Sequence, residues 1–114
     1  MSYPDPVMAI CYDFDGTLAP GNMQEYDFFP DLRIAPRDFW EESNALAREQ
    51  EVDPILAYMK LMLDKARLSG KVRVSRLAFR DYGRTVDLFK GVRSWFGEIN
   101  GYAAQRGVKL EHYI

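Results

Sequence analysis

Hydrophobic and polar positions divide the chain into a short uncharged run, a long stretch with helical periodicity and a second short run near the end. The first run covers residues 7–12, VMAICY, and carries no charge. Six such residues, followed closely by the turn signal of Asp15 and Gly16, are typical of a β-strand buried on both faces. We therefore expect a buried first strand, with Cys11 inside it as a small buried hydrophobic residue.

Residues 19–36 contain three prolines and a Pro-Gly-Asn turn signal without a clean period, which predicts a loop or connecting segment. Its aromatic side chains, Tyr26, Phe28 and Phe29, allow two interpretations. They either fill a core, as large apolar side chains mostly do, or line a pocket above the residues that follow the first strand.

Two long helices are predicted in the middle of the chain. Residues 36–50 start at a proline that suits the first turn, and they carry an apolar stripe of Phe39, Trp40, Ser43, Leu46 and Ala47. Asp53 followed by proline is an N-terminal signal for the next helix, which Gly70 ends. Its apolar positions at helical spacing, and so its expected buried face, are Ile55, Met59, Met62, Leu63 and Ala66.

The last third of the chain predicts two helices and a strand. Ser75 can cap a short helix that Gly83 ends, and residues 92–105 form a further helix with Val92, Trp95, Phe96, Ile99 and Ala103 on one face. Residues 108–114 alternate at first and predict a second strand. The division expected is therefore residues 1–20 as first strand and acidic turn, 21–106 as a helical cap region, and 107–114 as second strand. Because this insert is longer than a simple crossover needs, we expect it to lie over the acidic turn.

Composition narrows the class of protein. The chain has 114 residues, a net charge of −2 and one cysteine, so it suits one small domain or part of a larger one without an intrachain disulfide. No polybasic segment points to nucleic acid or to an anionic membrane. No signal peptide or apolar run of membrane-spanning length occurs, and we expect a soluble, cytoplasmic protein.

The candidate chemistry lies in residues 13–18, DFDGTL, here named the acidic turn. Asp13 and Asp15 point to the same side in extended geometry, so they can hold Mg²⁺ together or act as nucleophile and proton carrier. Gly16 allows close backbone approach, Thr17 adds a hydroxyl, and backbone N–H groups can cradle an anion. A solvated turn is the plain alternative, whereas a calcium loop is excluded because no acidic ligands continue at the required spacing.

The run VMAICYDFDGTL resembles the first signature motif of the haloacid dehalogenase-like (HAD) hydrolase superfamily, which mostly comprises Mg²⁺-dependent phosphatases with a Rossmann-like α/β core. The resemblance makes Asp13 the nucleophile and Asp15 the general acid/base. It makes the Asp13 side chain and the Asp15 carbonyl Mg²⁺ ligands, with Phe14, Gly16 and Thr17 supporting the phosphate site. The helical segment matches the family's cap, and the layout is similar to the phosphoserine- and phosphoglycolate-phosphatase-like branches.

The family's second, third and fourth motifs are not found before Ile114. We therefore expect the first part of an α/β HAD hydrolase, predominantly helical as given, whose substrate is a small phosphorylated metabolite. Such a chain should be a poor enzyme alone and can self-associate through its incomplete core. The alternatives are a non-catalytic fragment or helical interaction module, and other HAD chemistry (dehalogenase, phosphonatase, phosphomutase). Asp15 disfavours dehalogenation because a halide leaves without a proton.

The other polar and aromatic candidates do not belong to a motif of known chemistry. His112 is the only histidine and has no Cys/His partner set for zinc, so a packing or surface role is expected. Trp40, Trp95 and Phe96 either pack between helices or contact a substrate. Three lysines, Lys65, Lys71 and Lys90, do not match the spacing of the family's basic motif and are interpreted as solvated charges.

Overall fold

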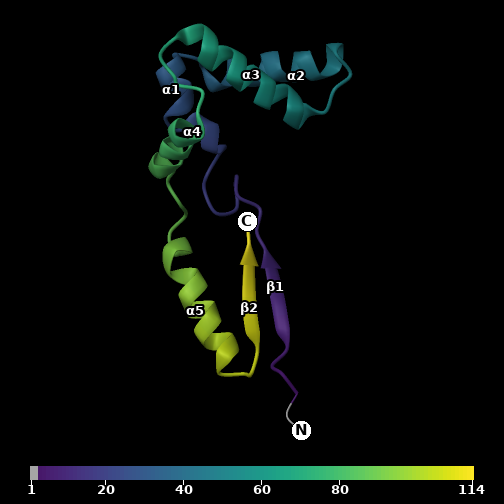
Figure 1. Cartoon of the computed structure of the whole chain (residues 1–114), viewed down its shortest axis with the longest axis vertical. Helices are drawn as coiled ribbons and strands as arrows, with labels where there is room; N and C mark the ends of the chain where they lie inside the picture. The colour runs from purple at the N-terminus through teal and green to yellow at the C-terminus, as the bar shows by residue number, and fades with distance from the viewer. Residues whose placement is uncertain (1–2) are drawn as a thin grey trace. The chain divides into compact units, whose positions relative to one another are not determined.

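The computed structural model describes residues 3–114, which fall into two compact units (Figure 1). The strand unit comprises the chain up to Asn22 together with Asp87–Ile114, and the helical unit comprises Met23–Val86. The protein is predominantly helical, with one two-stranded parallel sheet in the described part of the chain. Among residues 3–114, every helix is too short or too polar to cross a membrane.

The strand unit is built from β1 (Val7–Cys11), α5 (Val92–Ala104) and β2 (Lys109–Tyr113). The two strands run in the same direction, as their arrows in Figure 1 show, and α5 lies beside β2. Their register joins Val7 to Lys109 and Cys11 to Tyr113. The second strand and its preceding helix are thus confirmed within one residue of the expected bounds.

Burial of the first strand was predicted wrongly. Val7 is 57% and Met8 56% exposed, and Cys11 is exposed as well. Within the described residues β1 pairs with β2 alone, and α5 packs against one face of the pair. An uncharged strand that has no second layer over its other face stays accessible to water, so Cys11 is an exposed thiol and not a buried hydrophobic residue.

The helical unit begins with two short elements that the sequence pattern did not indicate. These are the 3₁₀ turn η1 (Met23–Glu25) and the helix α1 (Phe28–Leu32), within the segment expected to be a loop. Five residues are too few to display a helical period. Pro30 lies in the first turn of α1, where its missing N–H is tolerated. The remaining elements are α2 (Pro36–Glu49), α3 (Pro54–Ser69), α4 (Arg76–Tyr82) and η2 (Gly83–Thr85).

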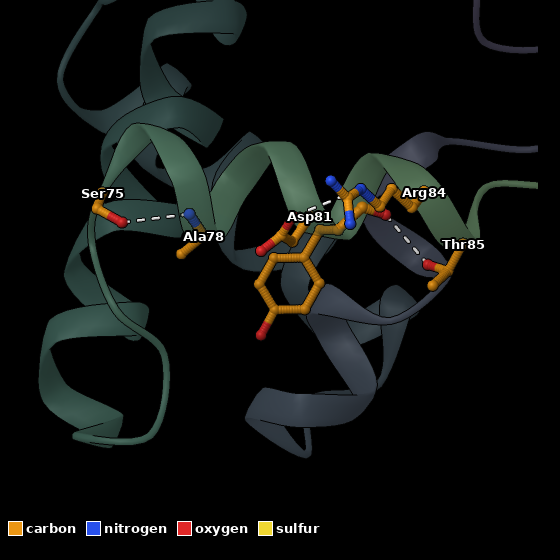
Figure 2. A network of polar contacts seen from close by, with 6 residues as sticks. Ser75, Ala78, Asp81, Arg84 and Thr85 are labelled. Atoms are coloured by element: carbon orange, nitrogen blue, oxygen red, sulfur yellow. Dashed lines mark hydrogen bonds and ion pairs between the residues drawn. The ribbon is translucent and has the colours of Figure 1, made fainter.

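Capping residues set the helix boundaries where the sequence placed them. The Asp53 carboxylate accepts a hydrogen bond from the Ile55 backbone N–H at 2.8 Å, and Gly70 ends α3 at a φ of 63°. Figure 2 shows Ser75 capping α4 through the Ala78 N–H, at 3.2 Å. Beyond the helix the Arg84 side chain lies 3.6 Å from the Asp81 carboxylate. The contacts of Asp53 and Ser75 confirm the predicted starts of α3 and α4.

The core of the helical unit is aromatic. Phe28, Phe29 and Phe39 are almost completely buried, and the rings of Phe29 and Phe39 lie 4.4 Å apart. Trp40 packs edge-on against three aromatic neighbours, and its indole N–H donates to the Glu25 carboxylate at 2.8 Å. The core interpretation is therefore confirmed for Phe28, Phe29 and Trp40.

The two long helices differ in how well their buried faces were predicted. In α2 the buried residues Phe39, Ser43 and Ala47 belong to the expected stripe. In α3 the buried residues are Ala57, Leu61 and Ala66, whereas half or more of the Ile55 and Met59 side chains is exposed. Apolar residues occur round most of α3, so spacing alone does not identify its inner face. Packing against the rest of the helical unit, including α2, decides it, since Leu61 and Ala66 belong to the core cluster with Phe28, Phe29 and Phe39.

Tyr82 provides a test of this packing at alkaline pH. Burial raises its pKa from 10.0 to about 12, and the hydrogen bond that its hydroxyl donates to Asp31 at 2.6 Å acts in the same direction, as does the charge of Asp27. The unfolded chain therefore loses this proton first, and the stability that the neutral hydroxyl contributes below pH 10 is lost as the pH rises towards 12.

We predict that Tyr82→Phe flattens the decline in unfolding free energy over this alkaline range. At neutral pH the variant should lose about 1 kcal/mol, the typical worth of one hydrogen bond. Urea unfolding followed by circular dichroism at a series of pH values measures both effects. Tyr3→Phe, at an almost fully exposed position, is the control. Parallel pH curves for wild type and Tyr82→Phe would contradict the prediction.

Candidate functional site

The acidic turn begins one residue beyond β1, after Tyr12, and is folded around one backbone carbonyl. The Phe14 carbonyl accepts hydrogen bonds from the N–H groups of Thr17, Leu18 and Ala19, at 3.1, 2.9 and 3.2 Å. The Gly16 N–H donates back to the Ala19 carbonyl at 2.7 Å. Gly16 has a φ of 79°, a left-handed conformation that side chains with a Cβ adopt only with strain.

Two further contacts anchor this turn in the strand unit. Leu18 and Ala19 are buried, and the Leu18 carbonyl accepts a hydrogen bond at 2.9 Å from the N–H of Phe89, in the segment that leads into α5. On the other side the Tyr12 N–H donates to the Tyr113 carbonyl at 2.8 Å, which continues the strand pairing up to Asp13. The turn is therefore held at both ends.

The predicted site residues are placed as follows. Asp13 is exposed, and its carboxylate accepts a hydrogen bond from the Thr17 hydroxyl at 3.3 Å. Asp15 is half-buried and forms an isolated parallel bridge with Ala19. The structure thus brings Thr17 to the Asp13 carboxylate. The carbonyl of Phe14 accepts the hydrogen bonds that shape the turn, and Gly16 supplies its left-handed backbone conformation.

The backbone amides of the turn are less free to bind an anion than the sequence led us to expect. Those of residues 16–19 already donate to the carbonyls of Phe14 and Ala19. An anion cradle built from the amides after Gly16 would require these hydrogen bonds to be shared or broken. Support for a bound phosphate from Thr17 would therefore come from its side chain, which lies beside Asp13.

A magnesium ion at the acidic turn would have to be largely hydrated. Within residues 3–114 no group of three His, Cys, Asp or Glu side chains lies close enough together to hold a metal. The Asp13 carboxylate and the Asp15 carbonyl are oxygen donors of the kind that Mg²⁺ prefers, and Mg²⁺ usually keeps several waters when only one or two carboxylates bind it. These two oxygen donors are the right kind for such an ion, and water would have to supply its remaining ligands.

The sequence did not predict a series of hydrogen bonds between side chains that starts at Tyr12, next to Asp13. The Trp95 indole N–H donates to the Tyr12 hydroxyl at 2.8 Å, and that hydroxyl lies 2.8 Å from Nδ1 of His112. The His112 Nε2 lies 2.7 Å from Oδ1 of Asn100. Since the indole only donates and Oδ1 only accepts, a neutral His112 protonated on Nε2 satisfies every contact, with Tyr12 donating to Nδ1.

Packing of aromatic rings supports the same group of hydrogen-bonded side chains. Phe96 meets the rings of Tyr12 and His112 edge-on, at centroid distances of 5.4 and 5.2 Å. The histidine therefore joins β2 to Tyr12, the residue that follows β1, and to Asn100 of α5, which is a packing role. Tyr12 and His112 are 100 positions apart, and no local spacing signals such a contact.

Two of the three basic candidates, Lys65 and Lys71, belong to the helical unit, and Lys90 belongs to the strand unit. Lys65 forms an ion pair of 2.6 Å with Glu42, which links α3 to α2, so it is not a simple solvated charge. Lys71 lies in the helical unit beside a shallow hollow lined by Asp27 and Asp81 among others. Lys90 is an exposed side chain in the strand unit.

No family model matches the chain, and neither the curated proteins nor the solved structures contain a match to it. An interpretation of the acidic turn therefore depends on its residues and their geometry.

We predict that Tyr12→Phe lowers the unfolding free energy by about 1 kcal/mol or somewhat more, because it leaves both the Trp95 N–H and the His112 Nδ1 without their partner. Urea unfolding gives the value. Tyr113→Phe is the matched control, since the hydroxyl of this exposed tyrosine donates only to the half-buried Glu111 on its own strand. Equal losses in the two variants would show that the chain of hydrogen bonds adds nothing to stability.

Proposed function

We propose that the acidic turn is the nucleophile half of a Mg²⁺-dependent phosphomonoester hydrolase site of the HAD type. The observation that carries the proposal is the Asp-Phe-Asp-Gly-Thr turn at the carboxyl end of a parallel strand, with the Thr17 hydroxyl on the Asp13 carboxylate. In open α/β sheets this end of a strand is where ligands bind. The exposed Asp13 is accessible to a phosphate ester.

The proposed reaction has two displacements at phosphorus. An Asp13 carboxylate oxygen attacks phosphorus while the bond to the ester oxygen breaks, and Asp15 gives its proton to the departing alkoxide. Asp15 then takes a proton from water, whose oxygen attacks the aspartyl-phosphate, so that the carboxylate of Asp13 and inorganic phosphate are released. When bound, Mg²⁺ neutralises charge on the phosphoryl oxygens. The Thr17 hydroxyl orients Asp13 by its hydrogen bond.

The helical unit supports this interpretation by its place in the chain. It is inserted after the acidic turn, between Asn22 and Asp87, and it forms a compact unit with its own aromatic core. An insertion at this point is consistent with a cap that selects the substrate, which we propose to be a small phosphorylated metabolite. Family resemblance gives the substrate class, and the structure adds the independence of the inserted unit.

The first displacement can be tested without requiring full turnover. We predict that acetyl phosphate and Mg²⁺ slowly transfer one phosphoryl group to the chain, detected as a mass increase that maps to Asp13. Asp13→Asn should lose the label, whereas Asp5→Asn, an exposed aspartate in the same unit, should keep it. Absence of label with Mg²⁺ present, or label persisting in Asp13→Asn, would overturn the nucleophile assignment and favour a non-catalytic interaction module.

The role of Asp15 is separated from that of Asp13 by the leaving group. Acetyl phosphate expels a stable anion, so Asp15→Asn should still be labelled by it. With an alkyl phosphate the leaving oxygen needs a proton, and labelling of Asp15→Asn should fall by about 100-fold or more, the typical contribution of a general acid. Equal effects with both donors would contradict a proton-transfer role.

A second candidate function is self-association through the strand unit, favoured by the exposure of β1. Val7, Ala9 and Cys11 are exposed on the face away from α5, and in the described residues β1 has a strand neighbour on one edge alone. Unpaired N–H and C=O groups on an uncharged strand are a template for another strand. The occupant that we propose is β1 of a second copy of the chain.

This association predicts a concentration-dependent dimer in light scattering coupled to size-exclusion chromatography. Ala9→Lys should shift the equilibrium towards monomer by placing a like charge in each strand. Leu68→Lys is the control, because that leucine is highly exposed in the helical unit. A single species at monomer mass over the whole concentration range, with little binding of a dye for apolar surfaces, would refute self-association.

A further inference from the structure

One side of α3 is apolar although it is open to water. Leu56 and Met59 are 63% and 50% exposed, and the half-buried Leu63 follows them at the spacing of a single helical face. These three residues are here named the outer stripe of α3. Val52 and Ile55, which lie close to it in the chain, are exposed as well. Exposed apolar patches on a small protein mark sites of association.

Two hollows in the helical unit border the outer stripe. One has a volume of about 380 Å³ and is lined by Leu46, Gln50, Val52, Leu56, Ala57 and Lys60. The other, of about 220 Å³, is lined by Met59, Met62, Leu63 and Phe79. Lys60 is the one charged residue in these linings, and it is paired with Asp64 on its own helix. The hollows can therefore accept the apolar side chains of a helix that packs along the stripe.

Charges at the two ends of α3 indicate which helix fits. Glu49 and Glu51 lie before its first turn, whereas Arg67 lies in its last turn and Lys71 just beyond it. All four side chains are exposed, and none of them forms an ion pair within residues 3–114. An antiparallel partner helix that is acidic at its start and basic at its end would match both ends. Helix α3 itself has this distribution of charge.

We propose that the outer stripe is the contact between two copies of the chain, with α3 packed antiparallel against α3 about a twofold axis near Met59. This arrangement places Leu56 of each copy opposite Leu63 of the other. Arg67 follows Met59 by as many residues as Glu51 precedes it, so each Arg67 approaches the Glu51 of the other copy. A twofold contact of this kind is closed, and a parallel pairing would bring like charges together.

The proposal does not depend on the phosphatase assignment, and it uses a different surface from the association through β1. Its test is therefore made in the Ala9→Lys chain, in which β1 does not contribute. Light scattering coupled to size-exclusion chromatography should still show a concentration-dependent dimer. Leu56→Glu should raise the dimer dissociation constant about tenfold or more, because it places a charge in the apolar contact.

A matched control separates the outer stripe from the rest of the helix. Leu68→Glu makes the same change at a leucine that is 86% exposed and lies about a third of a turn round the helix from Leu56. It should leave the dissociation constant unchanged. Circular dichroism should show both variants folded, since neither side chain is buried.

Charge reversal tests the antiparallel direction. Arg67→Glu and Glu51→Arg should each weaken the dimer by about tenfold, because each change puts like charges together at both ends of the contact. The double variant should recover the affinity of the parent chain. In a Cys11→Ser chain, Met59→Cys should form a disulfide-linked dimer on mild oxidation, whereas Leu68→Cys should not.

The outcomes distinguish this surface from β1. A dimer that Ala9→Lys abolishes would support association through β1 and overturn the contact through α3. Equal effects of Leu56→Glu and Leu68→Glu would also overturn it. If Leu56→Glu dissociates the dimer but the double charge variant does not recover, the stripe binds another surface, and the antiparallel pairing of α3 with itself is wrong.

Discussion

Parallel pairing of β1 with β2 is the constraint on which the strand unit depends. Since both strands run in one direction, the chain has to travel from the carboxyl end of β1 back to the amino end of β2. Helix α5 makes the return, and the helical unit is inserted before it. The direction of pairing also places the acidic turn at the carboxyl edge of the sheet. If the same two strands formed an antiparallel hairpin, no return helix such as α5 would be needed. Tyr12 and His112 would then lie at different ends of the pair and would not be in contact.

Local signals were sufficient wherever the structure is decided within a few residues. Asp53 and Ser75 set helix starts through contacts two and three positions away, Gly70 ends α3 in a left-handed conformation, and the sequence placed all three correctly. Burial is different, since it depends on which elements pack together. Cys11 sits in a strand with no charge, yet nothing covers its face in the described residues, and α3 turns an alanine-rich face inward that hydrophobicity alone does not single out.

The same distinction applies to the candidate site. The contact between Asp13 and Thr17 spans four positions and is readable from the order of residues, as is the need for glycine at position 16. The partners of Tyr12 lie 83 and 100 positions away, so they depend on the completed fold. The burial of Gln24, which is only 9% exposed, could not be predicted either. A glutamine in a proline-rich connecting segment is expected to face water, and the helices that bury it come later in the chain.

The separation between β1 and β2 has a consequence for the order of folding. Contacts within the helical unit, such as those of α2 with α3 across a short loop, are local, whereas the strand pair closes a loop of about a hundred residues. Local contacts form faster than distant ones, so the helical unit is able to fold while β1 still has no partner. During synthesis the first strand leaves the ribosome long before the second, and its apolar residues are unprotected throughout that interval. The strand unit is therefore the part of the chain at which a chaperone would be needed.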